Sequence, residues 1–139
     1  MTHLSTEAAL ELLKFHACSH GDTDHPKWKT GFLGSLRPYA GLDARNFHEV
    51  MSCLKAIEPR FEQPTIDSGL MADIWAICHL GRAWGVEPDG MLRRNNLISR
   101  EDVARLESWI FQISYTVFCL LAGCGDDAFE EYERFGRNQ

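Results

Sequence analysis

SWIFQISYTVFCLLAGCG, residues 108–125, carries no charged side chain over 18 positions and decides which class of fold the chain can adopt. A run of this length and hydrophobicity raises the question of a helix that spans a membrane. Polar side chains in its middle, such as Gln112 and Thr116, do not suit lipid, and the glycines at 123 and 125 end the helix early. We therefore predict a buried helix and no membrane partner.

The same residues could form a β-strand, because positions 110–118 are rich in β-branched and aromatic side chains. No second segment of the chain is a strand candidate that could pair with them. A helix start signal stands upstream instead, where Ser99 and Asp102 are spaced as a capping box. Apolar residues then recur at helical spacing, at Val103, Leu106, Ile110, Ile113, Val117 and Leu121. The sequence thus predicts a long helix that begins at Ser99.

Three more segments combine a side chain that can cap a helix with apolar residues at helical spacing. They run from Ser5 or Thr6 to about Ser19, from Asp43 to Pro59, and from Asp67 or Ser68 to about Trp84. A short terminal helix through Phe129 and Tyr132 is expected to cover one end of the core. We predict a single all-α domain over residues 1–139, a bundle of four main helices plus a short C-terminal one.

The third of these helices is apolar on nearly all sides. Leucine and isoleucine follow one face and alanines follow the opposite face, so we expect neighbours to cover both. His79 lies among the alanines and is expected to be a buried histidine with a hydrogen-bond partner. The residues predicted to belong to the core are Trp75, Ile77, Ile110 and Val117.

Two stretches, roughly residues 20–42 and 85–98, follow no helical or strand period. Both stretches are longer than the usual connection between helices in a bundle, which has about 2–8 residues. Long irregular connections are often functional. The first mixes glycines with aromatic and aliphatic residues, which favours a loop folded onto the body of the protein. The second contains the turn signal Pro88-Asp89-Gly90. We expect two long ordered loops.

The charge and cysteine content limit the expected partners and compartment. The 14 Lys and Arg residues and 20 Asp and Glu residues give a formal net charge of −6, which repels a phosphate backbone. Nucleic acid is therefore not an expected partner. The five cysteines show no C-x-x-C spacing, and the N-terminus lacks the pattern of a secretory signal, so a cytoplasmic location is expected.

HACSHGDTDH, residues 16–25, gathers six potential metal ligands. His16 and His20 are four positions apart and would point the same way if the helix persisted, and His25 could follow after a turn. That arrangement suits zinc or another divalent transition metal. Because the helix is ending there, we expect a polar helix end without a metal, and we expect replacement of His16 and His20 to cost little stability.

The alternative function is a metal-dependent hydrolase built in a helical bundle. It would use His16, His20 and His25, with His48 or His79 as completions, because such sites draw on more than one helix. No nucleophile elbow, phosphate-binding loop or local Cys–His pattern adds a second catalytic signal. The expected domain is therefore non-catalytic and has no cofactor.

The two irregular loops hold five of the 14 basic residues, beside aromatic side chains. Arginine and aromatic residues together often anchor interfaces. We expect a cationic-aromatic face at one end of the bundle that binds a small anionic ligand or an acidic surface of a protein partner, and the domain could also form a homo-oligomer. In the competing interpretation, the arginines cap helix carbonyls and the aromatic residues complete the core. The residues predicted for this face are Trp28, Arg37, Tyr39, Arg93 and Asn95.

Overall fold

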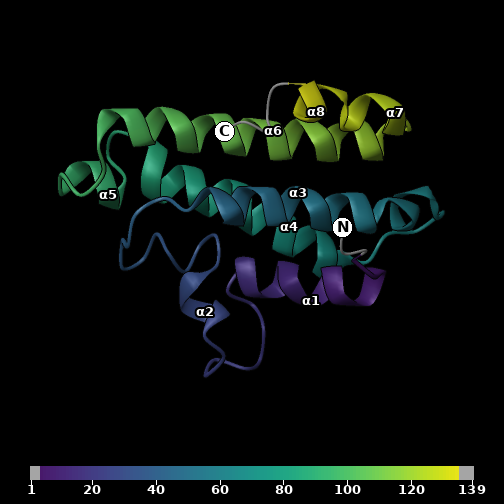
Figure 1. The fold of residues 1–139 in the computed structure, drawn as a ribbon, viewed down its shortest axis with the longest axis horizontal. Helices are drawn as coiled ribbons and strands as arrows, with labels where there is room; N and C mark the ends of the chain where they lie inside the picture. The colour runs from purple at the N-terminus through teal and green to yellow at the C-terminus, as the bar shows by residue number, and fades with distance from the viewer. Residues whose placement is uncertain (1–3, 135–139) are drawn as a thin grey trace.

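The computed structural model describes residues 4–134, and these residues form helices joined by loops and turns (Figure 1). No β-strand occurs in that range, where Leu36 and Tyr39 form an isolated bridge. The all-α fold predicted from the sequence is confirmed. The elements are α1 (Thr6–His16), α2 (Lys27–Thr30), α3 (Ala44–Ala56), the 3-10 helix η1 (Glu58–Glu62), α4 (Ser68–Gly81), the π-helix η2 (Arg82–Val86), α5 (Met91–Arg94), α6 (Arg100–Leu121), α7 (Gly125–Ala128) and α8 (Glu130–Arg134).

Each long helix begins at a side-chain cap. The side chain accepts a backbone N–H from two or three residues further along the chain, which satisfies a donor that the first turn would otherwise leave unpaired. The donor–acceptor distances are 3.0–3.1 Å, and the capping residues are Ser5, Asp43, Asp67 and Ser99. These four starts agree with the sequence prediction.

α1 ends at His16, earlier than the predicted end near Ser19. Cys18 adopts a left-handed conformation with a φ of 55°, and the N–H of Ser19 donates to the carbonyl of Lys14 at 2.8 Å. This is a Schellman termination. The helix ends before the predicted limit because Cys18 takes the left-handed conformation and closes it.

The α-helical part of α4 also ends before the predicted limit at Trp84. The chain continues from Arg82 to Val86 as a π-helix, and the N–H of Glu87 donates to the Arg82 carbonyl at 3.0 Å. Gly85 lies so close to α6 that a Cβ atom there would sit 2.4 Å from a methyl group of Leu106. The wider turn therefore brings the backbone against α6, where only glycine fits without displacement.

The four long helices form a bundle in which α1, α3, α6 and α4 follow one another around a shared core (Figure 1). α1 and α6 each pack against α3 and α4. At the centre, the rings of Phe47 and Trp109 stack with their centroids 5.5 Å apart. α7 and α8 lie beside α6 and cover its side toward α3, where Phe47 also meets Tyr132 at 5.7 Å.

The position of α7 and α8 leaves the outward side of α4 in solvent. Ile77, Ile110 and Val117 are buried, as predicted. The predictions for Trp75 and His79 are wrong, because Trp75 is 70% exposed and His79 is also exposed. α4 buries its faces toward α1 and α6. The sequence predicted that neighbours would cover the alanine-rich face as well, and this prediction is wrong because that side of α4 remains open.

The two long loops are ordered and folded against the bundle. The first contains α2 and buries Phe32, Leu33 and Leu36 in the core. Its path is tight at Gly34, where a Cβ atom would lie 2.2 Å from the carbonyl oxygen of Trp28. The second loop contains α5 and lies at the end of the bundle where α4 ends and α6 begins.

Candidate binding surface

His16 is fully buried at the end of α1, and both of its ring nitrogens are hydrogen-bonded. Nδ1 accepts the backbone N–H of Phe32 at 2.9 Å, and Nε2 lies 2.8 Å from Oε1 of Glu49. Because Nδ1 is an acceptor, the ring proton lies on Nε2, which donates to Glu49. His16 is the last residue of α1, where a polar helix end was predicted, but it is buried and joins the first loop to α1 and α3.

Glu49 is the centre of a partly buried cluster that also contains His16 and Lys27. The same Oε1 atom that receives the His16 proton lies 2.6 Å from the ammonium group of Lys27 in α2. The hydrogen bond from His16 and the positive charge of Lys27 lower the pKa of Glu49 to about 2, against the opposing effect of burial. A half-buried carboxylate with two donors is a structural tie between α1, α2 and α3.

The other two histidines of residues 16–25 pack on either side of one aromatic ring. His20 stacks on Phe15 with ring centroids 3.9 Å apart, and its Nε2 pairs with the carboxylate of Glu11. His25 lies 4.4 Å from the same ring. His16 faces the core instead, so the three imidazoles do not converge on one point.

The remaining histidines that were named as metal ligands lie on separate helices. His48 of α3 contacts the hydroxyl of Tyr132 at 2.7 Å, and His79 is exposed on α4. Over residues 4–134, no group of three or more His, Cys, Asp or Glu side chains is arranged to hold a metal ion. The described residues therefore give the hydrolase interpretation no geometric support.

Three of the cysteines, Cys18, Cys53 and Cys78, are not activated nucleophiles. All five are free thiols, and burial raises the pKa of Cys53 to about 12 and that of Cys78 to about 11. Burial also raises the pKa of Cys18. Because the thiolate is the reactive form, these groups stay protonated and unreactive at neutral pH.

The first loop reaches the end of the bundle where α5 lies, and its contacts there are with η2 and α6. The guanidinium of Arg37 lies over the ring of Trp84, 5.4 Å from its centroid. Two residues further on, the hydroxyl of Tyr39 donates to Oδ2 of Asp102 in the first turn of α6 at 3.3 Å. Burial and the neighbouring Asp102 carboxylate raise the pKa of Tyr39 to about 12. Both contacts join segments that are more than 40 residues apart.

Arg93 lies at the same end, because its guanidinium donates to the carbonyl of Val86 at 2.9 Å, two residues after Trp84. The side chain remains exposed while it caps this carbonyl. Asn95 donates to the carbonyl of Met91 at 2.8 Å within its own loop. We name Arg37, Tyr39, Trp84 and Arg93 the loop-end surface.

The structure does not bring Trp28 into this group. Its indole N–H donates to the carbonyl of His20 at 3.1 Å, inside the first loop. Conversely, sequence reasoning did not select Trp84 or Asp102 for the surface. Trp84 was assigned to a helix face and Asp102 to a helix cap, and no local pattern reveals that residues of a distant loop contact both.

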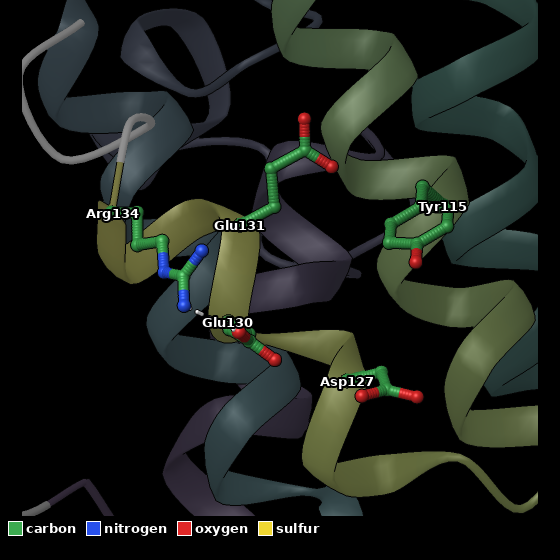
Figure 2. Close-up of a pocket in the computed structure, with 5 residues that line it drawn as sticks. All are labelled: Tyr115, Asp127, Glu130, Glu131 and Arg134. Atoms are coloured by element: carbon green, nitrogen blue, oxygen red, sulfur yellow. Dashed lines mark ion pairs between the residues drawn. The ribbon is translucent and has the colours of Figure 1, made fainter.

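A concave feature lies toward the opposite end of α6 (Figure 2). It is a pocket of about 230 Å³ between α6 and the short helices α7 and α8, lined by Tyr115, Asp127, Glu130, Glu131 and Arg134. Arg134 is paired with Glu130 at 2.9 Å, so the other carboxylates leave the pocket acidic. α6 thus separates an acidic end of the molecule from the arginines of the loop-end surface.

Comparison with protein-family models, with curated proteins and with solved structures finds no match to this chain. Within residues 4–134, no helix combines the length and the apolar character that crossing a membrane requires.

Proposed function

We propose that the chain is a non-catalytic cytoplasmic binding domain whose loop-end surface recognises an acidic surface of a partner protein or a small anionic ligand. The observation that carries this proposal is the position of the Arg37 guanidinium over the Trp84 ring. An arginine held on an aromatic face keeps its N–H groups free at the edge while its orientation is restricted. Such a group loses less conformational entropy on binding a carboxylate or phosphate.

The available charge supports the same proposal. Among the described residues, no carboxylate lies within 4.0 Å of the guanidinium nitrogens of Arg37, Arg93 or Arg94, whereas Arg45 and Arg134 are ion-paired. Unpaired arginines at one end of a chain with a net charge of −6 make a local site that attracts anions. Paired guanidinium N–H groups match the two oxygens of a carboxylate.

The cytoplasmic part of the proposal rests on the cysteines. Five free thiols and no disulfide are typical of proteins in a reducing compartment. Some of these thiols lie at or near the surface, where an oxidising environment would modify them.

Fluorescence anisotropy with a labelled hexaglutamate peptide, and calorimetric titration with inorganic phosphate, test the proposal with two sources of anionic groups. We expect at least one probe to bind, and Arg37→Ala or Arg93→Ala to weaken that binding about tenfold or more, because a hydrogen bond to a charged group contributes about 1.5–3 kcal/mol. Arg45→Ala is the matched control, since this exposed arginine is already paired with Asp43. Absence of binding to both probes, or an equal loss in the control, would contradict the proposal.

A further inference from the structure

Large apolar side chains remain exposed along one side of the bundle, on the outward faces of α4 and α6. Phe111 and Phe118 are seven positions apart on α6, so they lie on one face of the helix. Leu121 continues this face, seven positions after Ser114. The exposed fractions are 70% for Trp75, 59% for Phe111, 63% for Phe118 and 51% for Leu121.

Trp75 of α4 belongs to the same side. The guanidinium of Arg82 pairs with Glu107 of α6 at 3.5 Å, which marks where the outward sides of the two helices meet. Trp75 lies seven positions before Arg82 on its helix, and Ser114 lies seven positions after Glu107 on α6. A spacing of seven residues is two helical turns, so Trp75 and Ser114 lie on the same outward faces as the ion pair. We name Trp75, Phe111, Ser114, Phe118 and Leu121 the α4–α6 face.

The size of this face is that of half a dimer interface. A whole aromatic side chain offers about 150–250 Å², so the exposed fractions of the four large side chains correspond to about 500 Å² of apolar surface. The largest apolar patch on a typical monomer is about 300–600 Å², and patches of this size often have a function. A standard interface buries about 800 Å² per partner, and about 65% of a homodimer interface is apolar, which again gives about 500 Å².

The charge distribution favours a second copy of this chain as the occupant. Two copies that each carry a net charge of −6 repel one another, so a contact between them is most favourable where it places no like charges close together. α6 has no charged residue after Glu107, and the next one along the chain is Asp126. The start of α6 mixes both signs, with Arg100 and Arg105 beside Glu101, Asp102 and Glu107, whereas α7 and α8 at the other end are acidic. An antiparallel pair of α6 helices keeps the two acidic ends apart, because each lies beside the mixed-charge start of the other helix.

We propose that the chain forms a homodimer through the α4–α6 face, with the two copies of α6 crossing antiparallel about a two-fold axis near Ser114. The small side chain of Ser114 lies between the two phenylalanines, so the helices can approach closely at the axis. Phe111 of one protomer then packs toward the partner's Phe118, and the contact is self-complementary. No residue of the loop-end surface belongs to the α4–α6 face. The dimer therefore keeps both loop-end surfaces free, one at each end.

Light scattering coupled to size-exclusion chromatography, at about 100 μM protein, measures the assembly. We expect the wild type at twice 15.8 kDa and the Phe111→Glu/Phe118→Glu variant at 15.8 kDa. Leu97→Glu is the matched control, because Leu97 is 52% exposed but lies between α5 and α6, off the α4–α6 face, and this variant should stay dimeric. Circular dichroism confirms that each variant is folded. A monomeric wild type, or a dimer that persists in the double variant, overturns the proposal.

Cross-linking tests the antiparallel arrangement. Cys18, Cys78 and Cys124, the thiols that are not fully buried, are first replaced by serine. In that background, Ser114→Cys should form a disulfide with its own copy under mild oxidation, because residues near a two-fold axis face themselves. Ser52→Cys is exposed on α3 and serves as the control that should stay monomeric on a non-reducing gel. Equal cross-linking of the two variants contradicts the proposed axis.

Discussion

The imidazole of His16 connects two helices and a loop through its two nitrogens, with Glu49 Oε1 at 2.8 Å from Nε2 and the Phe32 N–H at 2.9 Å from Nδ1. The ring is fully buried, so its removal leaves the buried Phe32 N–H without an acceptor, whereas the half-buried Glu49 keeps Lys27 as a partner. His16 belongs to a sequence cluster of histidines and aspartates, but its role in the structure is to link two helices and a loop through buried hydrogen bonds.

His16→Ala is expected to lower the free energy of unfolding by about 2–4 kcal/mol, because it leaves a cavity and an unpaired buried N–H group. His20→Ala should lower it by less than about 1 kcal/mol, since His20 stacks on Phe15 at a partly exposed site. Urea denaturation followed by circular dichroism measures both. Equal midpoints for the two variants would show that the His16 contacts contribute little.

The pH dependence of stability should reveal Glu49. Its pKa is lowered from 4.5 to about 2 in the folded protein, so the folded state holds the charged form more strongly than the unfolded state does. The resulting stabilisation is present above about pH 4.5 and is lost as the pH falls toward about 2. Glu49→Gln is expected to be less stable than the wild type at pH 7 and to approach it below pH 3. A constant stability difference across this range would contradict the assignment.

The helix starts could be predicted because their causes are local. Ser5, Asp43, Asp67 and Ser99 each cap a helix through a bond to a residue two or three positions away, and residue order alone shows that spacing. The end of α1 could not be predicted equally well. A left-handed conformation is unusual for cysteine, so no local signal in the sequence indicates that the helix ends at His16.

The misassigned residues depend on partners far away in the sequence. His16 is buried because Glu49, 33 positions later, and the first loop close over it. Trp75 is exposed because α7 and α8 cover the α3 side of α6 and leave the α4 side open. The spacing of apolar residues in α4 cannot show where these two distant helices pack. For the loop-end surface, the sequence indicated the residue types Arg and Tyr, but the contacts with Trp84 and Asp102 require the fold.

Gly34 should be intolerant of a side chain. A Cβ atom there would lie 2.2 Å from the carbonyl oxygen of Trp28, and this backbone atom can move only with the loop. We expect Gly34→Ala to destabilise the protein by about 1–3 kcal/mol. Gly21→Ala is the control, because nothing lies within 4 Å of its Cβ position, and its effect should stay within about 0.5 kcal/mol. Thermal unfolding compares them, and a neutral Gly34→Ala would mean that the loop adapts.

Ile110 should contribute strongly to the core. Its side chain is buried and lies beside Gly81, where the end of α4 meets α6. Ile110→Ala should lower the free energy of unfolding by about 2–5 kcal/mol through lost burial and a cavity. Leu97→Ala, at an exposed position, should change it by less than about 0.5 kcal/mol. An unchanged denaturation midpoint for Ile110→Ala would contradict a central position for α6.

The loop-end surface predicts a specific role for Trp84 in anion binding. The Trp84 ring would not itself contact an anion, but it lies under the Arg37 guanidinium at 5.4 Å and restricts its orientation. Trp84→Leu should therefore weaken binding of the hexaglutamate peptide about 2- to 30-fold, since a cation–π contact contributes about 0.5–2 kcal/mol. Trp75→Leu removes an exposed tryptophan from the middle of the same helical segment, off the loop-end surface, and should leave the affinity unchanged. In the Arg37→Ala background, Trp84→Leu should add little further loss, because the two residues act as one unit. Additive losses in the double variant would show that Trp84 does not act through Arg37.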